Sequence, residues 1–304
     1  MKASEIIKQF GCDIPVSDFI LFSAGIVLFA IWLVKTSLGK TALTNSIPRR
    51  NNMPNYMPFI PLFIWFGVFS LATTIIKLLW PKLPDWQSAF FDNLFLCISA
   101  LIGIAVIVVV VKTHFARRLK GLGLNIKTIH KDLCAALVNL VSVWPLLIAI
   151  ITLTTFLGKF IWRQNFQFQQ HKELELIAAH PQLPLRVLIA ITTIAIVPVF
   201  EEMLFRGLFQ TMIRSVLLKP YPIGIESRSR TESDLARTSN EAWLAIAISS
   251  GLFALIHSNA DHWPALFVLS VCMGYAYEKS GSLFRPIFIH SLFNASSVIA
   301  VLSQ

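Results

Sequence analysis

Two adjacent glutamates interrupt an apolar stretch of the chain. Residues 191–209 read ITTIAIVPVFEEMLFRGLF and contain Glu201, Glu202 and, four positions later, Arg206. A charged group at membrane depth costs about 2.5–3.5 kcal/mol on insertion scales, so such groups usually face a cavity or a partner. On a helix, Glu202 and Arg206 are one turn apart and pair, whereas Glu201 projects about 100° away. We therefore predict that Arg206 neutralises Glu202 and that Glu201 is left for chemistry.

Further polar residues lie in two later apolar stretches. His257 ends the run AWLAIAISSGLFALIH, and the run FRPIFIHSLFNASSVIAV contains His290 and Asn294. The last two residues are one helical turn apart and share a face. One intramembrane histidine alone is as often structural as catalytic, but apolar spans rarely hold this many polar groups unless the groups converge. The pattern favours one site built from three helices.

The composition is that of a membrane protein. Of the 304 residues, 55% are hydrophobic and 14% are charged, and the mean hydropathy is +0.67. Soluble domains carry about 25% charged residues. We expect an all-α polytopic integral membrane protein with about eight transmembrane helices, each near the roughly 20 residues that a span needs. The predicted spans are residues 16–34, 57–80, 90–111, 133–157, 185–206, 242–257, 263–278 and 283–301.

The connections between these spans differ in charge. The first, third, fifth and seventh connections carry most of the 26 Lys and Arg residues, so they are predicted to be cytoplasmic and both termini to face outward. This topology accounts for the net charge of +10 without a nucleic-acid partner. Residues 219–241 are polar and are predicted to form a solvated linker. The polar stretch between the fourth and fifth spans is predicted to contain a short interfacial helix.

Other conspicuous residues are given structural interpretations. His262 is assigned to a short outward loop, and Gly251 and Gly274 to close packing between helices. The four cysteines show no CxxC spacing, so they predict neither a disulfide framework nor a cysteine metal site.

Three motifs resemble those of a known family. EExxxR beginning at Glu201, FxxxH ending at His257 and HxxxN beginning at His290 are similar to the successive motifs of the CPBP intramembrane proteases. This group contains the CaaX prenyl endopeptidases and the Abi bacteriocin-immunity proteins. The resemblance implies a protease domain over residues 185–301. Residues 1–184 form an N-terminal transmembrane region without a motif.

The resemblance implies peptide-bond hydrolysis inside the membrane. The substrate would be a membrane protein or a lipidated peptide, such as a prenylated CaaX tail, in the lipid bilayer of a bacterial inner membrane. A carboxylate in an apolar pocket suits the activation of water. The implied roles are water activation by Glu201 and His257, oxyanion stabilisation by His290 and Asn294, and support from Glu202 and Arg206.

Several alternatives stay open. The chain has no HExxH motif, and we favour a metal-free mechanism, with Zn²⁺ held by Glu201, His257 and His290 as the alternative. A non-catalytic membrane scaffold or immunity protein would use the same cavity to bind a partner. A proton-coupled transporter would use the same side chains as a relay, although the chain shows no internal repeat. The sequence does not determine the oligomeric state.

Overall fold

The helices of the protein follow the predicted apolar segments. The computed structural model describes residues 16–46, 48–162, 169–218 and 232–303, and this part of the chain contains helices and no β-strand. The all-α fold is thereby confirmed. The long helices are α2 (Val16–Lys35), α3 (Phe59–Leu79), α4 (Asp85–His114), α6 (Ile129–Trp162), a continuous run from α8 (Leu183–Ile191) to α10 (Thr211–Leu218), α11 (Glu232–Leu255), α12 (Trp263–Ser280) and α13 (Phe284–Leu302).

Many of these helices present apolar side chains outward. Phe63, Leu78 and Phe160 are 68%, 76% and 78% exposed, as expected for side chains that face lipid. Within the described residues, five helical stretches are long and apolar enough to cross a membrane. The chain is therefore a polytopic membrane protein, and the number of eight crossings stays a prediction. The five stretches are Phe59–Leu79, Asp85–His114, Ile126–Ile161, Leu183–Leu218 and Phe284–Leu302.

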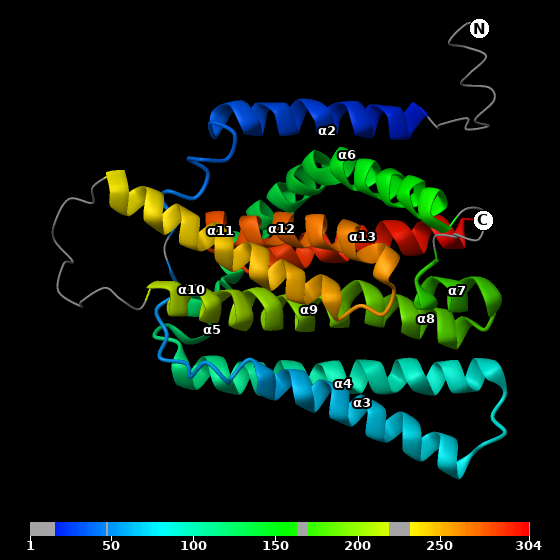
Figure 1. Ribbon diagram of the computed structural model, residues 1–304. Coiled ribbons are helices and arrows are strands. Elements are labelled where there is room, and N and C mark those ends of the chain that lie inside the picture. Colours follow the sequence, from blue (N-terminus) through cyan, green and yellow to red (C-terminus); the bar gives the residue numbers. More distant parts are fainter. Residues whose placement is uncertain (1–15, 47, 163–168, 219–231, 304) are drawn as a thin grey trace, which may run out of the picture.

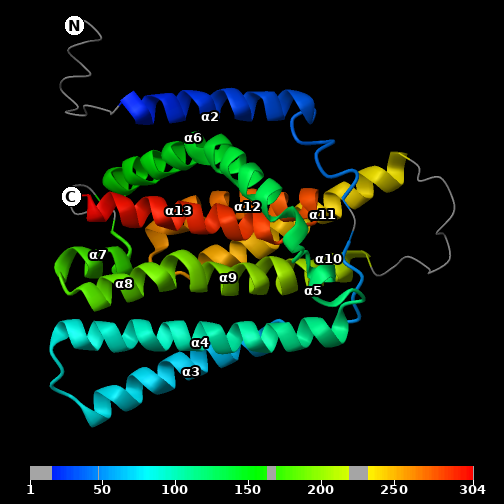
Figure 2. The same cartoon turned by 180° about the vertical axis from the view of Figure 1, so that it is seen from behind.

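The helices pack in layers around the run from α8 to α10 (Figure 1). The α3–α4 hairpin lies on one side of this run, and α11, α12 and α13 lie on the other. Helix α6 arches over α12 and α13, and α2 packs on α6 as the outermost layer (Figure 2). The helix that carries the two glutamates is consequently covered on both sides, which removes those carboxylates from lipid.

The central run alternates between α-helical and π-helical turns. Segment η3 (Thr192–Ile196) is π-helical, α9 (Val197–Glu202) is α-helical, and η4 (Met203–Gln210) is π-helical again. Single π-helical turns inside α-helices occur often at functional sites. Here they flank the acid pair on both sides.

Polar contacts continue along this run past Arg206. Gln210 Nε2 donates to the Gly274 carbonyl at 3.2 Å and to Glu278 Oε1 at 3.1 Å, and Arg214 pairs with Glu278. Because α12 supplies these partners, the helix continues to Leu218, beyond the predicted end at residue 206. We call this contact the polar seam; it consists of Arg206, Gln210 and Arg214 on the central run and Ser270, Gly274 and Glu278 on α12.

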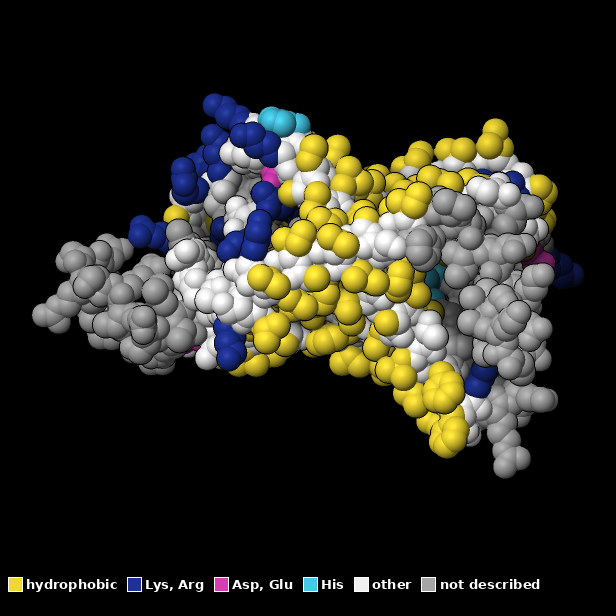
Figure 3. Space-filling model, turned by 90° about the horizontal axis from the view of Figure 1, so that it is seen from above, with side chains coloured by type: hydrophobic (Ala, Val, Ile, Leu, Met, Phe, Trp, Pro, Cys, Tyr) yellow, Lys and Arg dark blue, Asp and Glu magenta, His cyan; other side chains and the backbone are white. Residues whose placement is uncertain are grey.

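The basic connections gather at one end of the bundle. The backbone of Ala116 donates to the Arg50 carbonyl, and that of Leu283 donates to the Gly123 carbonyl, so the first, third and seventh connections are joined. The third connection contains α5 (Arg118–Leu122) and the short η1 (Ile126–Thr128). Lys and Arg side chains concentrate at this end, next to a band of apolar side chains (Figure 3). Which side of the membrane it faces stays a prediction.

Two predictions about the connections have different outcomes. A short helix does form between the fourth and fifth spans, as α7 (Lys172–Ala179). The predicted linker over residues 219–241 is wrong in part, because α11 begins at Glu232. Polar composition indicates contact with water, but it does not prevent an apolar helix from extending into water. Residues 219–231 lie outside the described part of the chain.

The predictions for the two glycines assigned to close packing, Gly274 and Gly251, also have different outcomes. A Cβ atom added at Gly274 would lie 2.8 Å from Gln210 Oε1 and 3.0 Å from Ile246 Cγ2, which confirms the close approach of α12 to its neighbours. A Cβ atom added at Gly251 would meet nothing within 4 Å. The prediction for Gly251 is therefore wrong.

We predict that Gly274→Ala lowers the stability of the protein and that Gly251→Ala does not. The added methyl group at Gly274 forces the seam apart, and overpacking of this kind costs about 1–3 kcal/mol. At Gly251 alanine only improves helix propensity, by up to about 1 kcal/mol. Thermal unfolding of both variants in one detergent tests this, and equal midpoints for the two variants would contradict it.

Candidate active site

The predicted pair of Glu202 and Arg206 is present and fully buried. Arg206 Nη1 donates to Glu202 Oε1 at 2.7 Å, and the two residues are 1% and 0% exposed. The guanidinium also lies over the Phe253 ring, with Cζ 4.8 Å from the ring centroid. Charge-assisted bonding and cation–π contact together offset the cost of removing both charges from water.

His290 on α13 lies between the two glutamates. Its Nδ1 is 2.9 Å from Glu202 Oε1, and its Nε2 is 3.8 Å from Glu201 Oε2. A carboxylate oxygen that already accepts from Arg206 acts as an acceptor here too, so Nδ1 carries the proton. In the neutral ring, Nε2 then presents its lone pair to Glu201.

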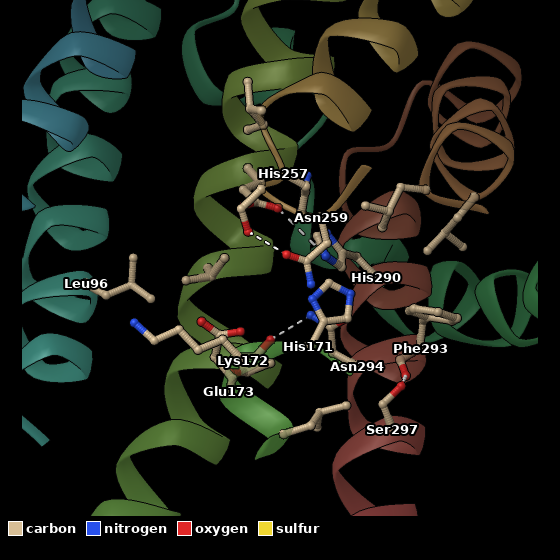
Figure 4. Close-up of a pocket in the computed structure, with 18 of the residues that line it drawn as sticks. Leu96, His171, Lys172, Glu173, His257, Asn259, His290, Phe293, Asn294 and Ser297 are labelled. Carbon is tan, nitrogen blue, oxygen red and sulfur yellow. Dashed lines mark hydrogen bonds and ion pairs between the residues drawn. The ribbon is translucent and has the colours of Figure 1, made fainter. Parts of the chain in front are cut away.

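Glu201 lines a cavity of about 370 Å³ together with other predicted residues. Figure 4 shows the cavity and labels His257, His290 and Asn294. Its side chain is 6% exposed and belongs to α9. His257, His290 and Asn294 line the same cavity, so the structure brings the four residues together from three separate parts of the chain. The arrangement places one carboxylate, two imidazoles and one amide around a space that would hold a peptide bond and a water molecule.

His257 lies in the turn after α11 and is held in a defined orientation. Its Nδ1 is 2.8 Å from the Phe253 carbonyl, and Trp263 Nε1 donates to the His257 carbonyl at 2.8 Å. Since a carbonyl only accepts, Nδ1 carries the proton and Nε2 is left as an acceptor. An imidazole with this tautomer accepts a hydrogen bond from water through Nε2.

The position of Asn294 follows from a proline. Pro198 has no N–H, so it cannot bond to the Thr193 carbonyl, its partner five residues earlier in a π-helical turn. Asn294 Nδ2 donates to that carbonyl instead, at 2.9 Å. The second N–H of the Asn294 amide remains for another acceptor.

Residues of α7 and of the α11–α12 connection close one end of the cavity. His171, which precedes α7, and Lys172 and Glu173 of α7 line it, and Ser258 and Asn259 line it from the connection. Figure 4 labels these residues except Ser258. Sequence reasoning missed all five. None belongs to a motif, and a polar residue next to a predicted interfacial helix carries no signal that it faces a site.

The two closing segments are joined by a contact that we call the histidine clasp. His262 Nδ1 is 2.9 Å from His171 Nε2, and His262 Nε2 is 2.6 Å from the Gln169 carbonyl. His262 lies in the 3₁₀ turn η5 (Ala260–His262) and is 7% exposed. His262 therefore lies in a short connection between two helices, as predicted, but its ring is buried against His171. The side of the membrane on which this connection lies stays a prediction.

Much of the remaining lining of the cavity is apolar and aromatic. Trp65, Phe66 and Phe69 come from α3, Leu96 from α4 and Phe293 from α13. Trp65 packs on Phe200 of the central run, with ring centroids 5.1 Å apart. The cavity thus combines a polar end with apolar lining from α3, α4 and α13, which suits an amphipathic ligand.

The alternative zinc site would use Glu201, His257 and His290. No three His, Cys, Asp or Glu side chains among the described residues lie in an arrangement that would hold a metal ion. His290 is directed to the two glutamates, and His257 is directed by its backbone partner. Both imidazoles use Nδ1 for these contacts and keep Nε2, as metal-ligating histidines do, so zinc held by Glu201, His257 and His290 stays an alternative to the metal-free mechanism.

Carboxylates and imidazoles around one cavity are groups that can activate water for hydrolysis. Residues 183–296 match the family described as Type II CAAX prenyl endopeptidase Rce1-like. This segment is less than half of the chain, and it contains all three motifs. The match confirms the resemblance to CPBP proteases and indicates a CAAX-type membrane protease with a peptide substrate. No curated protein and no solved structure matches the chain.

We predict that Arg206→Met strongly destabilises the protein because it leaves the Glu202 charge buried without its cation. Breaking a buried pair from one side costs about 3–5 kcal/mol. The double variant Glu202→Gln/Arg206→Met recovers part of this loss, since it removes both charges. Thermal unfolding in detergent measures the three proteins, and a double variant no more stable than Arg206→Met would contradict the pairing.

We also predict that the histidine clasp loosens in acid. Burial, together with His262 and His257, lowers the pKa of His171 from 6.5 to about 4. A released His171 therefore binds a proton more readily than a clasped one, so the clasp is fully formed above about pH 6.5 and weakens as the pH falls toward 4. Hydrogen exchange of α7, corrected for intrinsic rates, should rise between pH 7 and 5. His171→Phe cannot titrate and should show no such rise; a rise equal to wild type would refute this.

Proposed function

We propose that the protein is an intramembrane endopeptidase in which Glu201 activates a water molecule. The observation that carries this proposal is the arrangement of Glu201, His257 and His290 on one cavity, with the second carboxylate, Glu202, already paired. Glu201 is the only member of the acid pair that faces the cavity. It is therefore the carboxylate that takes a proton from water.

The tautomers suggest how the proton moves. Water donates one hydrogen bond to His257 Nε2 and loses its other proton to Glu201 as its oxygen attacks the peptide carbonyl. The proton then passes to His290 Nε2, which lies 3.8 Å from Glu201 Oε2. Protonated His290 and the second N–H of Asn294 donate to the oxyanion of the tetrahedral intermediate. Collapse of that intermediate breaks the C–N bond, and the amine leaves with the proton.

The lining of the cavity supports a membrane-associated substrate. The aromatic wall from α3 suits an apolar side chain or a lipid group, and the polar end near α7 suits the peptide backbone. A prenylated CaaX-type peptide and a single-span membrane protein both have this chemistry. We propose these two substrate classes.

Cleavage by purified protein in liposomes tests the proposal. Glu201→Gln keeps the size of the side chain and removes the base, so we expect the rate to fall by about 10²–10⁴. Glu175→Gln is the matched control, because Glu175 is exposed on α7 and lies outside the cavity lining. The substrates are a fluorogenic prenylated peptide and a panel of single-span proteins, each with and without a chelator.

The outcomes separate the alternatives. Cleavage that Glu175→Gln retains and Glu201→Gln loses supports the glutamate mechanism, whereas loss of wild-type cleavage in the chelator would point to zinc. If the folded wild type cleaves nothing and Glu201→Gln keeps the cellular phenotype, the hydrolytic proposal is wrong and a scaffold is favoured.

A further inference from the structure

Ser270 contacts the site from the side away from the cavity. It lies on α12, is fully buried and does not line the cavity. Its Oγ accepts from Arg206 Nη2 at 2.7 Å, and its carbonyl accepts from the same nitrogen at 3.2 Å. The other end of the guanidinium, Nη1, donates to Glu202. Ser270 is thus the first member of a chain of contacts that leads inward.

The chain ends on the histidine of the third motif. Glu202 Oε1 accepts from Arg206 Nη1 at 2.7 Å and from His290 Nδ1 at 2.9 Å. A single oxygen therefore holds both the arginine and the imidazole. Because Arg206 and His290 share this oxygen, a rotation of the guanidinium would displace Glu202 Oε1. That oxygen is the acceptor that keeps the His290 proton on Nδ1.

A guanidinium is a rigid planar fork, so the direction of one nitrogen fixes the direction of the other. Phe253 lies against the face of the Arg206 fork and limits its tilt, but a ring face does not limit rotation within the plane. The Oγ of Ser270 supplies that second restraint, with a hydrogen bond to a charged donor. Without it, Nη2 keeps only the longer contact to the Ser270 carbonyl.

We propose that Ser270 is a positioning residue: by holding Arg206 Nη2 it keeps Nη1 on Glu202 Oε1 and so keeps the His290 proton on Nδ1. This inference rests on the proposed function, because the role of that tautomer is to leave Nε2 free to receive the proton from Glu201. Ser270 itself touches neither water nor substrate. Its removal therefore lowers kcat by about tenfold or more, the usual size for a hydrogen bond to a charged group, and leaves KM unchanged.

The test compares Ser270→Ala with Ser249→Ala. Ser249 is also a buried serine, 1% exposed, and its Oγ donates to the Phe205 carbonyl at 3.0 Å, so this control loses one buried hydroxyl without touching Arg206. Nitrogen NMR of protein labelled in its seven histidines reports which ring nitrogen carries a proton, and a His290→Gln spectrum assigns the His290 signal. This measurement does not require cleavage.

We expect Ser270→Ala to change the protonation pattern of His290 and Ser249→Ala to leave it as in wild type. An unchanged His290 signal in folded Ser270→Ala overturns the proposal. Should Ser270→Ala not fold, Ser270→Cys, which has similar volume and accepts hydrogen bonds poorly, is measured in the same way. If neither Ser270 variant folds while Ser249→Ala does, Ser270 is a structural residue and the proposal is equally overturned.

The same preparations separate this inference from the proposed function. Absence of cleavage by wild type, with a changed His290 signal in Ser270→Ala, removes the protease function and leaves the positioning role. Cleavage by wild type, with an unchanged His290 signal in Ser270→Ala, supports the protease function and overturns the positioning role. Loss of kcat at constant KM in Ser270→Ala, with normal kinetics in Ser249→Ala, supports both.

Discussion

Glu202 Oε1 accepts hydrogen bonds from Arg206 on its own helix and from His290 on α13. A carboxylate buried in an apolar bundle is tolerable only when it is paired and hydrogen-bonded, so this oxygen requires both partners at once. Arg206 in turn needs acceptors on α12. The packing of the central run, α12 and α13 against one another therefore follows from the placement of one buried charge.

The π-helical turns of the central run also depend on partners from neighbouring helices. Backbone groups inside a membrane must find partners within the protein, so a π-helical segment persists only where neighbours complete its hydrogen bonds. Asn294 binds the Thr193 carbonyl, and Ser249 binds the Phe205 carbonyl. Asn294 of α13 thus completes a hydrogen bond of the distorted backbone as well as facing the site, and Ser249 of α11 completes another without lining the cavity.

Spacing along the chain predicted the contacts that depend on one helical turn. The pairing of Glu202 with Arg206, and the placing of Asn294 beside His290 on the cavity, follow from positions four residues apart. The long helices of the described part of the chain were likewise predictable from apolar runs. The extension of the central helix to Leu218 was not, because its partner Glu278 is distant in the sequence.

Contacts between residues that are far apart in the sequence could not be predicted from spacing. Ser270 meets Arg206 across 64 positions, and His171 meets His262 across 91. Neither serine in an apolar helix nor histidine in a polar connection carries a distinguishing pattern. One remote contact could have been anticipated. Pro198 has no N–H and leaves a backbone carbonyl without its helical donor, so a side-chain amide such as that of Asn294 was a candidate partner.

The two walls of the cavity are held by different kinds of force. On the side of α12 and α13, buried ion pairs and hydrogen bonds fix each group in direction and distance. On the side of α3, the contacts to the central run are aromatic, as between Trp65 and Phe200 and between Phe59 and Phe209. Apolar contacts tolerate changes of shape much better than directional ones do. Under the proposed function, the aromatic residues of α3 act on substrate preference and the directional contacts of α12 and α13 act on proton handling. Substitutions in α3 would then change what the cavity admits without altering the groups that move the proton.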